Sequence, residues 1–195
     1  MGSSALAIWA GRRRDRVDEL YTAHAAVGGT SRGRRTATVQ LNWALALRLA
    51  GEFQGYARDL HDESIDILVA TAVTQNLQSV LQVTFALGRK LDQGNANPSS
   101  LQQDFSRLGV PILDRVKQAD PRGDHLLKSL TDLNTARNAI AHSQPGKLAS
   151  VLGGSPSLRL DHIKRWDVAL KRLAVIIDRV TAVELASLTG GVLPW

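Results

Sequence analysis

Apolar side chains recur at every third or fourth position along most of this chain, and that spacing limits the folds open to it. In the last long segment, for example, Trp166, Leu170, Leu173 and Ile177 follow one another in this way. Side chains so spaced share one face of an α-helix, whereas a half-buried strand would alternate apolar and polar residues. We expect long helices over residues 12–26, 38–61, 63–92, 124–143 and 160–188, with shorter helical segments near 101–108 and 111–118. No segment alternates like a strand, so the sequence predicts an all-α bundle of five to six helices.

The chain has 195 residues, which is enough for one domain with a substantial core. We expect residues 1–37 to form an N-terminal helix and a basic loop, and residues 38–189 to form the helical bundle, as one domain overall. We expect residues 1–11 to be loosely ordered. The stretch "DES" at residues 62–64 offers N-cap chemistry, so it predicts a helix boundary there.

Charge and composition favour particular partners and a particular compartment. The chain carries 24 Lys and Arg against 18 Asp and Glu, a net charge of +6, which favours polyanions such as RNA. It has no cysteine, which excludes disulfides and thiolate metal sites and suits a reducing cytoplasm. No signal peptide is evident, and no apolar run approaches the roughly 18 residues of a membrane span. We therefore expect a cytoplasmic protein that does not enter the membrane.

Two runs of arginine, "GRRRDR" and "SRGRR", stand out near the start of the chain. Taken alone, each is best read as solvated surface. The second run supplies Arg32, Arg34 and Arg35, which are our candidates for guiding RNA by non-specific attraction of its phosphates.

The segment "LNTARNAIAHSQPGKL", residues 133–148, concentrates polar groups in the last turns of a mostly apolar helix. Asn138 and His142 are four residues apart and share one helix face, while Arg137 and His142 lie about 140° apart around an ideal helix. Histidine moves protons near neutral pH, and arginine holds a phosphate through two parallel hydrogen bonds. RNA supplies its own nucleophile, the ribose 2′-hydroxyl, so this pair can cleave RNA without a metal. By spacing alone, chance and helix capping explain an Arg and a His here more simply.

The same segment resembles a known family. "LTDLNTARNAIAH" looks like the signature of HEPN domains: an arginine, a polar residue that is often Asn, three further residues and a histidine near the end of a late helix. Upstream, "WALALRLAGEFQGYARDLHDES" is similar to the early long helix of HEPN proteins of the RiboL-PSP type. The resemblance covers about residues 38–185 and implies a bundle of four to six helices.

The resemblance also implies an activity. It implies a metal-independent endoribonuclease that works as a homodimer without a cofactor, often a toxin or an antiviral-defence effector with an antitoxin or other partner protein. His142 would be the general acid and base, Arg137 the phosphate clamp, and Asn138 a polar orienting residue. Glu52 would support Arg137 or His142, although an i,i+4 pair with Arg48 is an equal alternative.

Two rival interpretations remain open at this point. One is a HEPN-like bundle that binds RNA or protein without cleaving it, and the other is an unrelated helical interaction domain. A metal site is not expected, because the other histidines (His24, His61, His125 and His162) are scattered and lack paired carboxylate spacing. Some HEPN toxins carry a regulatory tyrosine two residues after the histidine. Gln144 stands there in this chain, so that form of control is not expected.

Overall fold

The computed structural model describes residues 2–28, 36–72, 74–155 and 157–195, and every regular element within them is helical. The elements in chain order are α1 (Ser4–Ile8), the π-helical turn η1 (Trp9–Arg13), α2 (Arg14–Gly28), α3 (Thr36–Ala72), α4 (Gln75–Ala86), α5 (Lys90–Gln93), α6 (Pro98–Ser106), α7 (Ile112–Ala119), α8 (Gly123–Ala141), α9 (Pro145–Val151) and α10 (Leu160–Thr189). The all-α class is therefore confirmed. The expected count of five to six helices is wrong, because it is too low.

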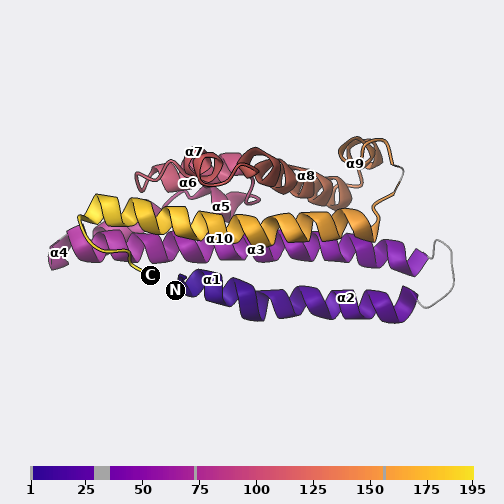
Figure 1. Cartoon of the computed structure of the whole chain (residues 1–195), viewed down its shortest axis with the longest axis horizontal. Coiled ribbons are helices and arrows are strands. Elements are labelled where there is room, and N and C mark those ends of the chain that lie inside the picture. The colour runs from indigo at the N-terminus through magenta and orange to yellow at the C-terminus, as the bar shows by residue number, and fades with distance from the viewer. Residues whose placement is uncertain (1, 29–35, 73, 156) are drawn as a thin grey trace.

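Two long helices, α3 and α10, form the centre of the molecule and lie side by side along its length (Figure 1). The rod made by α1, η1 and α2 packs along one side of α3. On the other side, α7 and α8 pack on α10, and α8 also contacts α3. The core therefore lies between three layers of helices, with α3 in contact with all of them.

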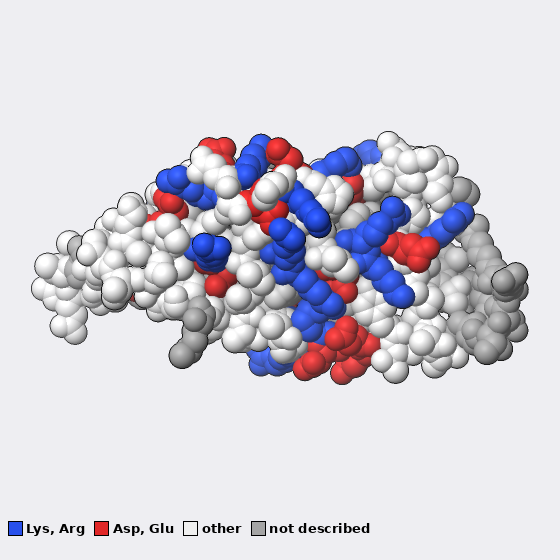
Figure 2. All heavy atoms as spheres, in the orientation of Figure 1, with Lys and Arg blue, Asp and Glu red and all other residues white. Residues whose placement is uncertain are grey.

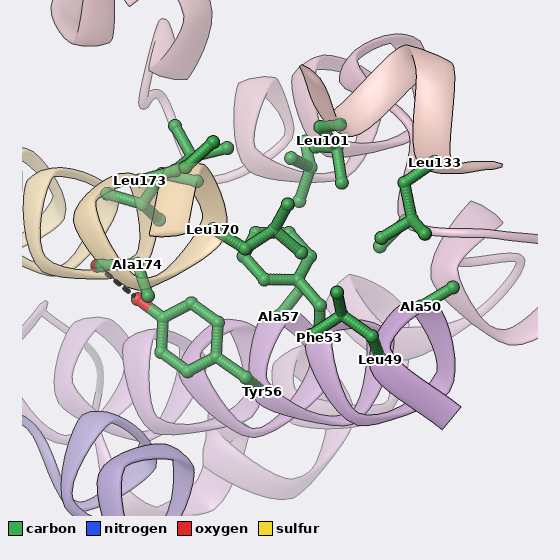
Figure 3. Close-up of a cluster of buried hydrophobic side chains, with 14 of the residues drawn as sticks. Leu49, Ala50, Phe53, Tyr56, Ala57, Leu101, Leu133, Leu170, Leu173 and Ala174 are labelled. Carbon is green, nitrogen blue, oxygen red and sulfur yellow. Dashed lines mark hydrogen bonds between the residues drawn. The ribbon is translucent and has the colours of Figure 1, made fainter. Parts of the chain in front are cut away.

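The core is built from the apolar faces that the helical spacing predicts (Figure 3). Phe53 of α3 and Leu170 of α10 are fully buried there, and the hydroxyl of buried Tyr56 donates a 2.8 Å hydrogen bond to the carbonyl of Ala174. This bond satisfies the Tyr56 hydroxyl, which would destabilise the fold if it were buried without a hydrogen-bond partner. Trp9 of η1 packs edge-on against Phe53, with ring centroids 5.6 Å apart.

The structure places residues 4–11 in helical segments, contrary to the expectation that residues 1–11 are loosely ordered. Ser3 caps α1 by accepting a hydrogen bond from the Leu6 amide, and the Glu63 carboxylate of α3 accepts from the Ser4 amide at 3.1 Å. Trp9 is buried as the anchor of this segment. The cause is tertiary: a short helix that is marginal alone is held by burial of its apolar face.

The predicted boundary at residues 62–64 is also wrong, because α3 continues through it. Ser64 is buried inside the helix, and its hydroxyl donates to the carbonyl of Leu60 at 2.7 Å instead of capping a new helix. The predicted helix over 63–92 is correspondingly divided, with a new helix beginning after Thr74 and a turn with positive φ at Gly88. Among the described residues, no helix combines the length and apolarity that crossing a bilayer requires.

Candidate functional site

The Arg137–His142 segment forms the last turns of α8 and ends in a well-defined turn. His142 is the C-cap, the Ser143 amide donates to the Ile140 carbonyl, and the Gln144 amide donates to the Ala139 carbonyl at 2.8 Å. This is the Schellman arrangement, in which the residue after the C-cap takes a left-handed conformation that usually belongs to glycine. Here Ser143 takes it, with φ of 52°. The turn fixes the backbone of His142 at the open end of the helix.

Arg137 and Asn138 are linked to each other and to a neighbouring loop. Nη1 of Arg137 donates to Oδ1 of Asn138 at 3.0 Å, and the Asn95 side-chain amide donates to the same oxygen at 2.7 Å. Within the part of the chain that the structure describes, Arg137 has no carboxylate partner. Its positive charge is therefore not neutralised by an ion pair.

His142 is exposed and, within the described residues, its imidazole has no hydrogen-bond partner. No hydrogen bond joins it to Arg137, in keeping with the roughly 140° that separates the two positions around α8. One chain thus presents the two side chains from the same helix end without bringing them together.

An apolar pocket of about 350 Å³ lies beside the turn. Ala139, Ile140 and Ser143 line it from the α8 side, and Trp43 lines it from α3. Its walls carry few polar groups, so it suits an apolar or aromatic group next to His142.

Glu52 lies inside an arginine cluster on α3 and does not pair with Arg137. It is 4% exposed, and its carboxylate accepts from Arg13 at 3.0 Å, from Arg16 at 3.2 Å and from Arg48 at 3.3 Å. Burial alone favours the neutral acid, but the hydrogen bonds and charges of Arg13 and Arg16 outweigh it and lower the pKa of Glu52. The alternative i,i+4 pair with Arg48 is the one that the structure contains.

This cluster lines a hollow of about 700 Å³ between α3 and the η1–α2 segment. Its charged lining consists of Arg13, Arg16, Arg48, Arg58, Glu52 and Asp59. Four arginines therefore line the hollow with two carboxylates, and Arg58 also pairs with Asp92 outside the lining at 3.1 Å. We call this hollow, defined by the four arginines, the arginine hollow.

A second basic hollow of about 530 Å³, the α8–α10 groove, lies between those two helices. Its lining includes Arg122, His125, His162, Lys164, Arg165 and Trp166. Burial and the nearby Arg165 charge lower the pKa of His162. Ser129, on the α8 wall of this groove, lies about 140° around the helix from His142, so the groove opens on a different side of α8. Figure 2 shows Lys and Arg side chains over the middle of one face, interspersed with acidic ones.

The remaining candidates divide between structural roles and residues that lie outside the description. His61 is fully buried inside α3, where its ring packs edge-on against Phe105 and burial, followed by the Arg89 charge, lowers its pKa. It is therefore a core residue. Arg32, Arg34 and Arg35 lie outside the described residues. Among the residues that are described, no group of three or more His, Asp or Glu side chains is placed to hold a metal ion.

Comparison with family models, with curated proteins and with solved structures gives no match.

The sequence did not predict that Asn95 bonds to the Arg137–Asn138 pair, or that Arg13 and Arg16 bind Glu52. Asn95 gave no signal, because it stands in a loop that is distant in sequence from Asn138. Arg13 and Arg16 were read as part of a solvated run, yet Arg13 is only 16% exposed and binds both Glu52 and Asp59. The i,i+4 spacing of Arg48 and Glu52 was the one clue available from sequence.

Proposed function

We propose that this chain is a metal-independent endoribonuclease of HEPN type, with Arg137 and His142 as its catalytic pair. The observation that carries the proposal is the state of these side chains: an unpartnered imidazole and an arginine without a carboxylate, presented at one open helix end. An unrelated interaction domain would be expected to bury Arg137 in an ion pair. An arginine that binds a phosphate must have donors available, because its planar fork holds two phosphate oxygens at once.

The reaction follows from the chemistry of RNA. His142 accepts the proton of a ribose 2′-hydroxyl, whose oxygen bonds to the adjacent phosphorus as the bond from phosphorus to the 5′-oxygen breaks. The leaving oxygen takes a proton from a general acid, and the products end in a 2′,3′-cyclic phosphate and a 5′-hydroxyl. Arg137 stabilises the extra negative charge on the phosphate oxygens in the transition state. Asn138 holds Arg137 Nη1 through its amide oxygen.

A second copy of the chain completes this scheme. One imidazole cannot accept one proton and donate another at the same instant, and within one chain Arg137 and His142 do not converge. A homodimer that faces two α8 ends would supply both proton carriers and both arginines to one strand. The family resemblance further suggests a role as a toxin or in antiviral defence, together with an antitoxin or other partner protein.

The test is cleavage of a labelled single-stranded RNA by the purified protein. We expect products in the presence of EDTA, no products from DNA of the same sequence, and no products from His142→Ala. His125→Ala is the matched control, because His125 is an exposed histidine on the same helix. Its activity should equal that of the unaltered chain, and circular dichroism should show equal helix content in both variants. Full activity in His142→Ala would end the proposal.

A non-catalytic binding module is the second candidate, and one observation favours it. Arg137 and Asn138 already form a closed hydrogen-bonded pair with Asn95, an arrangement that suits recognition without turnover. This function predicts that RNA or a protein partner binds without cleavage products, and that His142→Ala leaves the binding unchanged.

A further inference from the structure

The arginine hollow contains more hydrogen-bond donors than its own carboxylates use. Within the described residues, Arg16 and Arg48 each donate through Nη1 alone, and both donate to Glu52. A guanidinium has five N–H donors, so most donors of each remain available. The Arg16 and Arg48 side chains are 46% and 50% exposed, which leaves those donors accessible to a ligand.

The hollow is also held in shape before any ligand arrives. Glu52 is buried and fixes three arginines, and Arg13 is held a second time by Asp59 at 2.8 Å. Gly55 makes room for this arrangement, since a Cβ there would lie 2.2 Å from Nη1 of Arg13. Arginines that are fixed by a shared carboxylate lose little further freedom when they bind a phosphate.

The hollow borders the catalytic candidates through one short loop. Gln54, on its wall, donates to the carbonyls of Leu91 and Gly94, and Arg58 donates to the Leu91 carbonyl at 2.9 Å. The residue after Gly94 is Asn95, which donates to Asn138. The hollow and the Arg137–Asn138 pair therefore contact adjacent residues of the same loop.

We propose that the arginine hollow binds the phosphate backbone of the RNA strand next to the bond that Arg137 and His142 cleave. The inference rests on the proposed function for the identity of the ligand. Two phosphates of the strand contact Arg16 and Arg48, while Glu52 remains bound to Arg13 and keeps the hollow in shape. The binding is insensitive to sequence, because no base edge is read.

The experiment measures RNA affinity in the uncleaving His142→Ala background. The test variant adds Arg16→Gln with Arg48→Gln, and the matched control adds Lys164→Gln with Arg165→Gln, an equal loss of charge in the α8–α10 groove. Fluorescence anisotropy of a labelled single-stranded RNA is recorded over a range of salt concentrations. For a single strand, each phosphate contact adds about 0.7 to the steepness of the plot of log affinity against log salt concentration. Removing a contact makes the plot shallower by the same amount.

The expected result is a slope that is smaller by about 1.4 in the test variant, equivalent to roughly 25-fold weaker binding at 0.1 M salt. The control should bind as its parent does. With His142 restored, the Arg16/Arg48 variant should show a raised KM and an unchanged kcat, which a general loss of structure would not produce.

Equal weakening in both variants would show that net charge alone attracts RNA and would overturn the inference. Absence of RNA binding in the His142→Ala parent would also overturn it. The experiment tests the proposed function separately. If the unaltered chain binds RNA through Arg16 and Arg48 but never cleaves it, RNA binding by the hollow is supported and the nuclease activity is refuted. If the unaltered chain cleaves RNA but the test variant binds RNA as tightly as the control, the nuclease activity is supported and RNA binding by the hollow is refuted.

Discussion

The buried ion pair between Arg14 and Asp167 joins α2 to α10, and we predict that removing one charge destabilises the protein severely. The two side chains form a bidentate pair, with N–O distances of 2.6 Å and 3.0 Å and exposures of only 7% and 8%. In Asp167→Asn the arginine stays buried, and among the described residues the exposed Asp18, at 3.3 Å, is then its only acidic partner. An uncompensated buried charge of this kind costs about 3–5 kcal/mol, a large part of the 5–15 kcal/mol that stabilises a typical domain.

The assay is urea unfolding of the whole protein, followed by circular dichroism. The control is Lys128→Gln, which removes an exposed i,i+4 pair with Asp132 and should cost no more than about 0.5 kcal/mol. The double variant Arg14→Met with Asp167→Leu removes both charges and should be more stable than Asp167→Asn alone, since no orphan charge remains. A cost below about 1 kcal/mol for Asp167→Asn, or a double variant that is less stable than the single one, would refute the reasoning.

Two further predictions concern the fold and its response to acid. Gly123→Ala should destabilise the protein by about 1–3 kcal/mol in urea unfolding, because its Cβ would lie 2.7 Å from the backbone of Lys117; Gly51→Ala, with open space around it, should instead be neutral or stabilising. The pKa of Glu52 is lowered in the folded state, so its stabilising contribution is present above the ordinary value of 4.5 and is lost as the pH falls through the folded value. Glu52→Gln should therefore show a shallower loss of stability between neutral pH and acid than the unaltered chain, and an equal slope would contradict the pairing with Arg13.

Periodicity was sufficient for the helical class and for the longest helices because it reports one local property, the face that each segment buries. The stripe that includes Trp166 and Leu170 in α10 is buried as predicted. Boundaries failed where tertiary contacts decide them. Ser64 looks like a cap in sequence but is satisfied inside α3, and the short α1 is stabilised by contacts with Glu63 that a local pattern cannot show.

The candidate site was only partly accessible to sequence for the same reason. Arg137, Asn138 and His142 are neighbours in sequence, so helix geometry predicted their relative placement. The arginine hollow gathers residues from η1, α2 and α3, and Arg13 is 39 positions from Glu52. No local rule predicts which of many arginines shares a buried carboxylate.

The charges around Glu52 and around Arg137 differ in a way that bears on the proposed nuclease activity. Glu52 holds three arginines together without neutralising them all, while Arg137 is held only by the neutral Asn138. Arg137 is paired with a neutral amide, so its full positive charge is available to stabilise a transition state. Arg13, Arg16 and Arg48 share the carboxylate of Glu52, so less net positive charge remains to bind a substrate in its ground state. The first arrangement favours catalysis and the second favours binding. In the nuclease that we propose, the end of α8 would therefore govern kcat and the arginine hollow on α3 would govern KM, and separate measurement of kcat and KM tests this division.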